Sequence, residues 1–121
     1  HGVGAEAHGI PCELNLALLH QEDGEDDAAV EILSACIERL HRTRRSGLEA
    51  IAHCLLLPSL AAQRNDVAFQ RHLTRGAELF DSTGYRDPDA ILALQESVRI
   101  GRRLGWNELA DRAQELADQM D

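Results

Sequence analysis

The apolar positions of the chain repeat with a period of 40 residues, and this register holds three times without an insertion. Four sets of positions show it: Ala29, Phe69 and Leu109; Leu33, Leu73 and Ala113; Ile37, Ala77 and Ala117; and Leu40, Phe80 and Met120. Internal periods of about 20–50 residues are typical of repeat proteins, which stack their units and present an extended surface. The pattern therefore favours a protein that binds a partner over one that transforms a substrate.

Apolar residues at helical spacing, separated by short polar turns, predict six helices. The helices are expected from residue 11 to 21, from a cap at Asp26 or Asp27 to 44, from 48 to 64, from the Asn65-Asp66 cap to 82, from the Asp87 cap and Pro88 to the turn at 104–105, and from the Asn107 cap to Met120. Pro58 lies inside the third helix. Because proline has no backbone N–H and its ring clashes with the preceding turn, we expect a kink or a break near Leu57.

The composition is rich in Leu and Ala and has only four aromatic residues, which favours an all-α protein. Short turns between helices make antiparallel neighbours. The sequence therefore predicts three antiparallel helix hairpins, at about 10–45, 46–84 and 85–121, in one helical repeat domain spanning 10–121. Residues 1–9 contain three glycines and few apolar side chains, and we expect them to form a flexible lead-in.

The net charge and the cysteine pattern restrict the classes of partner and the cellular compartment that the sequence allows. The formal net charge is -9, and all 12 cationic residues are Arg, a usage typical of GC-rich bacterial genomes. Proteins that bind nucleic acids or anionic membranes do so with a surplus of Lys and Arg. This chain has an acidic surplus, so we expect neither as a partner. Cys12, Cys36 and Cys54 form no zinc-binding pattern and are expected to be reduced thiols. With no membrane-span-length apolar run and no signal peptide, the sequence predicts a cytoplasmic protein.

The second helix of each hairpin resembles that of tetratricopeptide-type repeats, in which a small–x–x–x–large–x–x–small pattern follows a polar turn. Ala29, Leu33 and Cys36 fit this pattern best; Ala110, Gln114 and Ala117 fit in part; and Phe69, Leu73, Gly76 and Ala77 form a shifted version. The Trp–Leu–Gly–Tyr features of the family's first helix are absent, and the period of 40 exceeds the family's 34. The chain is closer to the longer hairpins of MalT-like bacterial regulators and of domains beside some bacterial kinases.

This resemblance implies a right-handed helical stack without catalysis, which recognises a peptide, a protein or a small effector on its concave face. Armadillo or HEAT-like packing and a plain helical bundle are the alternative architectures. On any of the three, the sequence indicates an all-α fold.

No motif of catalytic or metal chemistry is present, so we expect no enzyme activity, no cofactor and no metal. The acidic run at 21–27 lacks the spacing of a calcium loop. His20, His41, His53 and His72 form no pair four residues apart, and no nucleophile elbow, P-loop or dinucleotide fingerprint occurs. The basic run at 39–45 offers a grip for phosphate or an acidic peptide, or it complements a helix C-terminus.

Eight residues are predicted to contact a partner. Five are polar positions on the first helices of the hairpins, which line the concave face in tetratricopeptide-type repeats, and three are aromatic or Arg residues in turns, types that are enriched at binding hot spots. They are Asn15, His53, Gln63, Gln95 and Arg99, and Tyr85, Arg86 and Trp106. Arg99 is suited to holding a carboxylate. Trp106 has a structural alternative, in which it fastens the last helix to its neighbour.

These observations predict an interaction module of a larger bacterial regulatory protein. Its partner is expected to be a protein or peptide, or a second copy in a homodimer, because the first hairpin has no polar cap on its outer side. The alternative is a helical domain that senses a small effector between its hairpins. Pro58 and Gly76 are the residues expected to leave room for such a ligand.

Overall fold

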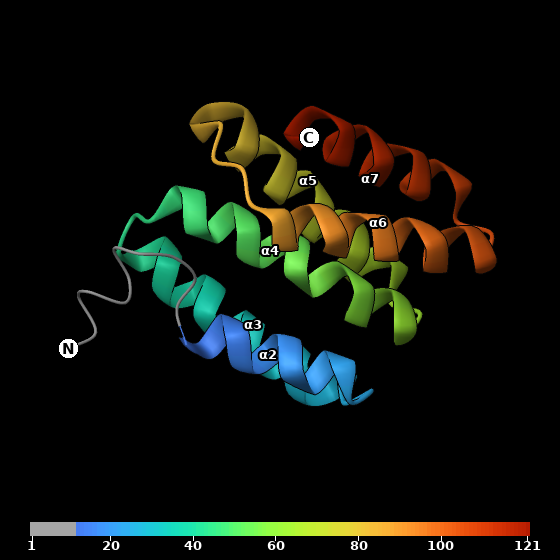
Figure 1. The fold of residues 1–121 in the computed structure, drawn as a ribbon, viewed down its shortest axis with the longest axis horizontal. Coiled ribbons are helices and arrows are strands. Elements are labelled where there is room, and N and C mark those ends of the chain that lie inside the picture. The colour runs from blue at the N-terminus through green and yellow to red at the C-terminus, as the bar shows by residue number, and fades with distance from the viewer. Residues whose placement is uncertain (1–11) are drawn as a thin grey trace.

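A computed structural model of the chain describes residues 12–121, which form six α-helices and no strand (Figure 1). The helices are α2 (Cys12–Glu22), α3 (Asp26–Arg42), α4 (Ser46–Ala62), α5 (Asp66–Thr83), α6 (Pro88–Arg103) and α7 (Asn107–Met120). The all-α class predicted from the sequence is therefore confirmed. The lead-in predicted at 1–9 and the first helical residue predicted at 11 lie outside the described residues.

Each turn between helices contains one residue with a left-handed backbone, and these residues recur about every 20 positions. They are Gly24, Arg44, Arg64, Gly84 and Gly105, with φ between 57° and 83°. A left-handed residue ends a helix because the N–H groups around it turn back to the carbonyls of the last turn. In this way the N–H of Arg45 donates to the carbonyl of Leu40 at 2.9 Å. α3 and α4 therefore end at Arg42 and Ala62, two residues earlier than predicted.

Two of the predicted helix starts are confirmed by side-chain caps. Asn65 accepts a hydrogen bond from the backbone N–H of Ala68 at 3.1 Å at the start of α5. Asp87 accepts one from the N–H of Asp89 at 3.1 Å, and Pro88 occupies the first position of α6. These polar side chains satisfy N–H groups that have no partner inside the helix, which is why they mark its beginning.

Two other predicted caps are wrong by one residue. Glu25 holds the N-cap position of α3 without a side-chain cap bond, and the two aspartates predicted to cap this helix are its first helical residues. One of them, Asp26, accepts a hydrogen bond from Ser59 Oγ at 2.8 Å and so ties α3 to α4 instead of capping its own helix. At α7, Trp106 and not Asn107 occupies the N-cap position.

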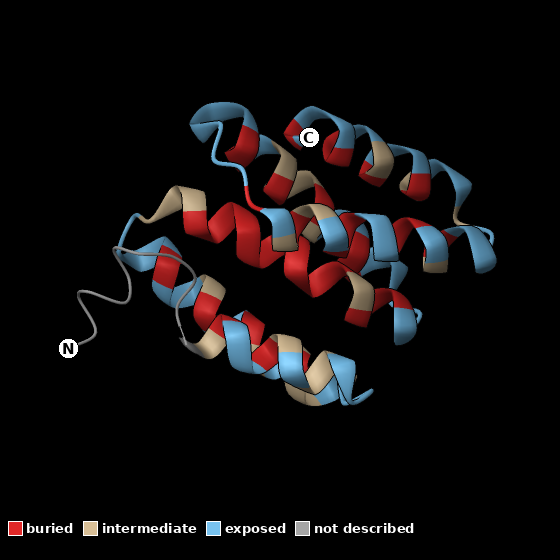
Figure 2. Cartoon of the chain, in the orientation of Figure 1, coloured by how far each residue is buried: buried red, intermediate tan, exposed pale blue. Residues whose placement is uncertain are grey.

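α4 is the central helix of the fold. It packs against α3, α5 and α6, and 13 of its 17 residues are buried (Figure 2). The other helices bury one face each, and α2 packs mainly on α3 while α7 packs mainly on α6. Two full sets of the 40-residue register lie in the core: Leu33, Leu73 and Ala113, and Leu40, Phe80 and Met120. The repeat in the sequence is therefore a repeat of core positions.

Pro58 does not break α4, which continues to Ala62. Of the kink or break predicted near Leu57, the break is therefore wrong. A proline inside a helix leaves the carbonyl four residues earlier without its usual donor and loosens the adjacent turn. The carbonyl left in this way is that of Cys54. One residue further along, Nε2 of Gln21, on α2, donates to the carbonyl of Leu55 at 2.8 Å. The packing of α4 among its neighbouring helices offsets the local cost of the proline.

Candidate partner-binding groove

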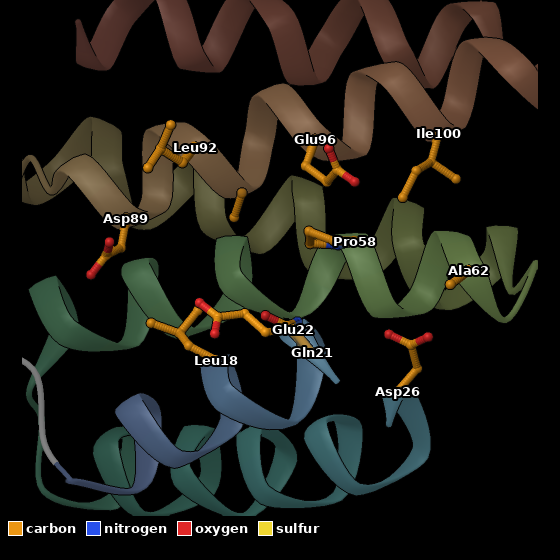
Figure 3. Close-up of a pocket in the computed structure, with 11 residues that line it drawn as sticks. Leu18, Gln21, Glu22, Asp26, Pro58, Ala62, Asp89, Leu92, Glu96 and Ile100 are labelled. Carbon is orange, nitrogen blue, oxygen red and sulfur yellow. The ribbon is translucent and has the colours of Figure 1, made fainter. Parts of the chain in front are cut away.

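A groove with a volume of about 430 Å³ lies between α2, α4 and α6 (Figure 3). α6 packs along α4, whereas α2 packs on α3 and makes few contacts with α4, which leaves the space between α2 and α6 unfilled. The groove is lined by Leu18, Gln21 and Glu22 of α2, Asp26 of α3, Pro58 and Ala62 of α4, and Asp89, Leu92, Ala93, Glu96 and Ile100 of α6.

The lining combines apolar and acidic side chains. Six of its eleven residues are apolar, four are acidic and none is basic. Leu92 is 62% exposed, although a side chain of this size and chemistry is usually buried. In Figure 3, Asp89 and Asp26 lie at opposite ends of the groove, with Glu22 and Glu96 between them. An apolar surface edged by carboxylates is thus exposed on one side of the molecule.

The floor of the groove is fixed by a chain of hydrogen bonds. Nε2 of Gln21 donates to Ser59 Oγ at 3.0 Å, in addition to its bond to the α4 backbone, and Ser59 Oγ donates to Asp26 at 2.8 Å. These bonds join α2, α4 and α3 beside Pro58. They hold the floor in place and use the donor groups of the only amide side chain in the groove.

The four carboxylates of the groove differ in whether another side chain of the protein binds them. Nε of Arg99 donates to Glu96 at 3.0 Å, and this hydrogen bond lowers the pKa of the Glu96 carboxyl. Asp26 is engaged by Ser59. Glu22 and Asp89 have no ion-pair partner in residues 12–121. These two acids are therefore the ones best placed to receive a cation from outside.

None of the eight residues predicted to contact a partner lines this groove. Two of them bind carboxylates of the chain itself. Nε2 of Gln63 donates to Asp27 at 2.6 Å and joins the end of α4 to the start of α3. Arg99 holds a carboxylate, as its chemistry suggested, but the carboxylate is that of Glu96 on its own helix.

Two predicted contact residues in the α5–α6 turn pack against other parts of the chain. Arg86 donates to the backbone carbonyls of Met120 and Asp121, at 3.2 and 3.1 Å, and so fastens the end of α7. Tyr85 is 45% exposed, and its ring lies over the start of α4. A Cβ atom at Gly47 would come within 2.5 Å of that ring, so the glycine is required for the contact.

The remaining residues on the surface are separated from one another. The ring of Trp106 meets that of Phe69 edge to face, with centroids 5.5 Å apart, and this contact joins α7 to α5. The geometry agrees with the structural alternative for Trp106. Asn15 on α2 and Gln95 on α6 are exposed on helices that border the groove, but their side chains do not line it. Their role in binding stays a prediction.

His53 is not on the surface. It is 5% exposed and belongs to a polar cluster between α4 and α5, which we call the Glu49–His53–His72 cluster. Nε2 of His53 lies 3.1 Å from Glu49 Oε2, and its Nδ1 lies 2.9 Å from Nδ1 of His72. Glu49 also lies 3.3 Å from His41 Nδ1 and 3.9 Å from Arg75 Nε. Sequence reasoning missed the cluster because His72 reaches Glu49 and His53 only through the packing of α5 on α4.

The hydrogen bonds of the cluster define the proton positions. With both rings neutral, Nε2 of His53 carries the proton and donates to the carboxylate of Glu49, and Nδ1 of His53 accepts from Nδ1–H of His72. Burial lowers the pKa of both imidazoles, and for His72 burial, the neighbouring His53 and the charge of Arg71 lower it to about 4. At neutral pH the hydrogen bonds of the cluster therefore join α4 to α5.

Within residues 12–121 no group of three or more His, Cys, Asp or Glu side chains is placed to hold a metal ion. Cys36 and Cys54 are free thiols and buried, as expected for reduced cysteines, and burial raises the pKa of Cys54 to about 12. The side chain of Cys12 lies outside the described part of the chain. None of the helices described is long and apolar enough to cross a membrane.

Comparisons of this chain with protein-family models, curated proteins and solved structures find no match. The resemblance to tetratricopeptide-type repeats therefore rests on the residue pattern. The evidence for the groove is the geometry of this chain alone.

The sequence does contain a signal for the groove. On α6, the positions 89, 92, 93, 96 and 100 follow helical spacing and form a second stripe beside the core stripe of Ile91, Leu94 and Val98. Leu92 lies outside the face that α6 buries, and Ile100 lies at the edge of that face, partly buried. A leftover apolar stripe interrupted by Asp89 and Glu96 is a pattern that can be searched for in similar sequences.

Proposed function

We propose that this chain is a non-enzymatic interaction module of a larger bacterial regulatory protein, working in the cytoplasm. In this proposal three helix hairpins, at about 10–45, 46–84 and 85–121, stack as a short right-handed tetratricopeptide-like solenoid. The groove between α2, α4 and α6 holds a segment of a partner protein. These are the first helices of the three hairpins, which line the binding face in the repeat family that the sequence resembles.

The groove with its exposed Leu92 is the observation that carries the proposal. Exposed apolar surface edged by polar groups marks sites of protein association. Three helices meet at the groove, and the hydrogen bonds of Gln21 fix its floor, so the surface is formed before a partner arrives. A preformed site binds with less loss of conformational entropy than a flexible one.

Site-specific photocross-linking in the native host tests the proposal. A benzoyl-phenylalanine at position 92 is expected to give a discrete adduct with another protein. The control carries the same residue at Val67, which is 70% exposed on α5 and outside the groove. Equal labelling at both positions, or no protein adduct at 92, would contradict the proposal. An adduct with a second copy of the chain would place self-association in the groove.

A small effector is the second candidate, since a volume of about 430 Å³ falls within the range of about 300–1,000 Å³ found for ligand pockets. Of the two residues expected to leave room, Pro58 lines the groove, whereas Gly76 is packed against His53 and Cys54. A ligand that binds only the native state must raise its stability. A metabolite that raises the melting temperature of the wild type, but not of Leu92→Glu, would favour this function.

A further inference from the structure

We infer that the partner segment is a cationic amphipathic helix, whose apolar face meets the floor of the groove and whose Arg or Lys side chains meet Glu22 and Asp89. This inference rests on the proposed function, because it names the chemistry of the segment that the same groove receives. Three observations support it: the lining is acidic, the floor is apolar, and the backbone groups of the helices that form the walls are already hydrogen-bonded.

The walls favour a helix over an extended peptide. An extended segment needs partners for its backbone N–H and C=O groups, whereas a helix satisfies them internally. The groove is built from helices, whose own backbone groups are already bonded, and Gln21, its only amide side chain, donates to Leu55 and Ser59. The stripe on α6 from Asp89 to Ile100 is about 16 Å long at 1.5 Å per residue, the length of about three helical turns.

The apolar floor indicates that the face of the bound helix that points inward is apolar. Leu18, Leu92 and Ile100 come from α2 and α6, and Pro58 lies between these helices on α4. An amphipathic helix placed in such a groove anchors with apolar residues at i, i+3, i+4 and i+7. Burying Leu92, which is 62% exposed, would remove from water a large apolar side chain that the fold leaves uncovered.

The charge of the groove indicates which side chains the other face of the bound helix carries. The lining contains four carboxylates and no cation, and Glu22 and Asp89 have no ion-pair partner in the part of the chain that the structure describes. Opposite charges across an interface favour encounter and exclude partners of the wrong sign. An acidic segment would be repelled here, while Arg or Lys would complete the interaction.

A second copy of this chain does not supply such a segment from its described residues. The helices that carry Arg are α3, α5, α6 and α7, and each of them already buries its apolar face in the core of its own copy. The exposed Leu16 and Leu19 of α2 lie on a helix whose described part has no Arg or Lys. With a net charge of -9, two copies also repel each other overall. We therefore assign the groove to a different protein.

Designed peptides of about 14 residues, or about four helical turns, test the inference. The first has Leu at i, i+3, i+4 and i+7 and Arg on the flanks. The second has the same Leu positions with Glu in place of Arg, and the third has the composition of the first in scrambled order. Fluorescence anisotropy with the purified chain is expected to show binding of the first peptide only. Equal binding of the second or the third, or no binding of the first, would overturn the inference.

A matched pair of variants locates the binding site. Glu22→Gln with Asp89→Asn removes two carboxylates from the groove, and Glu31→Gln with Glu38→Gln removes two exposed ones from α3. From the usual strength of exposed ion pairs, the groove variant is expected to bind the first peptide about fivefold more weakly. The α3 variant is expected to change its affinity less than twofold. Equal losses in both variants would show attraction by net charge and overturn the inference.

The inference and the proposed function can fail separately. If position 92 cross-links a protein but the labelled segment of that protein is acidic or uncharged, the function stands and the inference is wrong. If no protein cross-links at position 92, the function is wrong whatever the designed peptides do. Melting curves of both double variants should match that of the wild type, because all four substituted carboxylates are free of hydrogen bonds that join helices.

Discussion

α4 carries polar side chains on two faces, and the two faces differ in what surrounds them. Toward α5, Glu49 and His53 of the Glu49–His53–His72 cluster are buried, His72 is half-buried, and each of the three is paired within the chain. Toward α2 and α6, the polar groups around Pro58 lie beside an open groove with an apolar floor. The closed face links two helices of the fold, and the open face is the one that we propose for recognition. The difference lies in whether a neighbouring helix covers the polar groups of α4.

The largest difference between the two faces should appear when their apolar side chains are truncated. Phe69→Ala on the closed side removes a fully buried ring and its contact with Trp106, and should destabilise the chain by about 3–5 kcal/mol. Leu92→Ala in the groove should change stability by less than about 0.5 kcal/mol. Urea denaturation followed by circular dichroism measures both. A Leu92→Ala loss close to that of Phe69→Ala would mean that the groove is part of the core.

Removing the carboxylate of the cluster should have the next largest effect. Glu49→Ala leaves the Nε2–H of His53 buried without an acceptor, which should cost about 1–3 kcal/mol. Glu31→Ala, at an exposed position of α3, is the control and should change stability by less than about 0.5 kcal/mol. Similar losses for the two variants would show that the cluster does not link α4 to α5.

The cluster should also make stability depend on pH. The pKa of His72 is about 4 in the folded chain against about 6.5 in the unfolded chain, so the unfolded state binds more protons between these values. Stability should therefore be complete above about pH 6.5 and fall as the pH decreases toward 4. Thermal melts across this range should show a smaller slope for His72→Gln. An unchanged slope would mean that His72 titrates normally in the folded state.

The smallest effect is expected in the turn between α4 and α5. Arg64 has φ of 59°, a conformation that costs an L-residue about 1–2 kcal/mol and glycine little. Because glycine also loses more entropy on folding, Arg64→Gly should stabilise the chain by about 0.5–1 kcal/mol. The melting temperature measures the gain. A loss of stability would show that the arginine side chain contributes more than its backbone costs.

The sequence predicted the features of the fold that are encoded locally. Helices, turns and the caps at Asn65 and Asp87 follow from periodicity and from short-range hydrogen bonds. The ends of α3 and α4 were misplaced because Arg44 and Arg64 adopt the left-handed conformation for which glycine is the usual signal. The break at Pro58 was wrong because its cost is met by packing with other helices, which a local pattern does not contain.

The candidate site was harder to predict because it depends on how helices are placed. His53 and His72 are 19 residues apart and meet only when α5 packs on α4, where a Cβ atom at Gly76 would lie 3.4 Å from the Cβ of His53. The groove depends on α2 packing on α3 and leaving α6 exposed. The polar residues predicted on the first helices do not line the groove, because its floor is apolar and its polar side chains are four carboxylates and the Gln21 amide, which is bonded within the chain.

Methyl chemical shifts of the chain, measured while the basic amphipathic peptide is added, test the central claim most directly. The claim predicts that the methyl signals of Leu18, Leu92 and Ile100 shift together and saturate, while those of Val67 and Leu16 stay unchanged. Shifts centred on Val67 or Leu16, with the groove signals unchanged, would contradict the claim that the space between α2, α4 and α6 is the binding site.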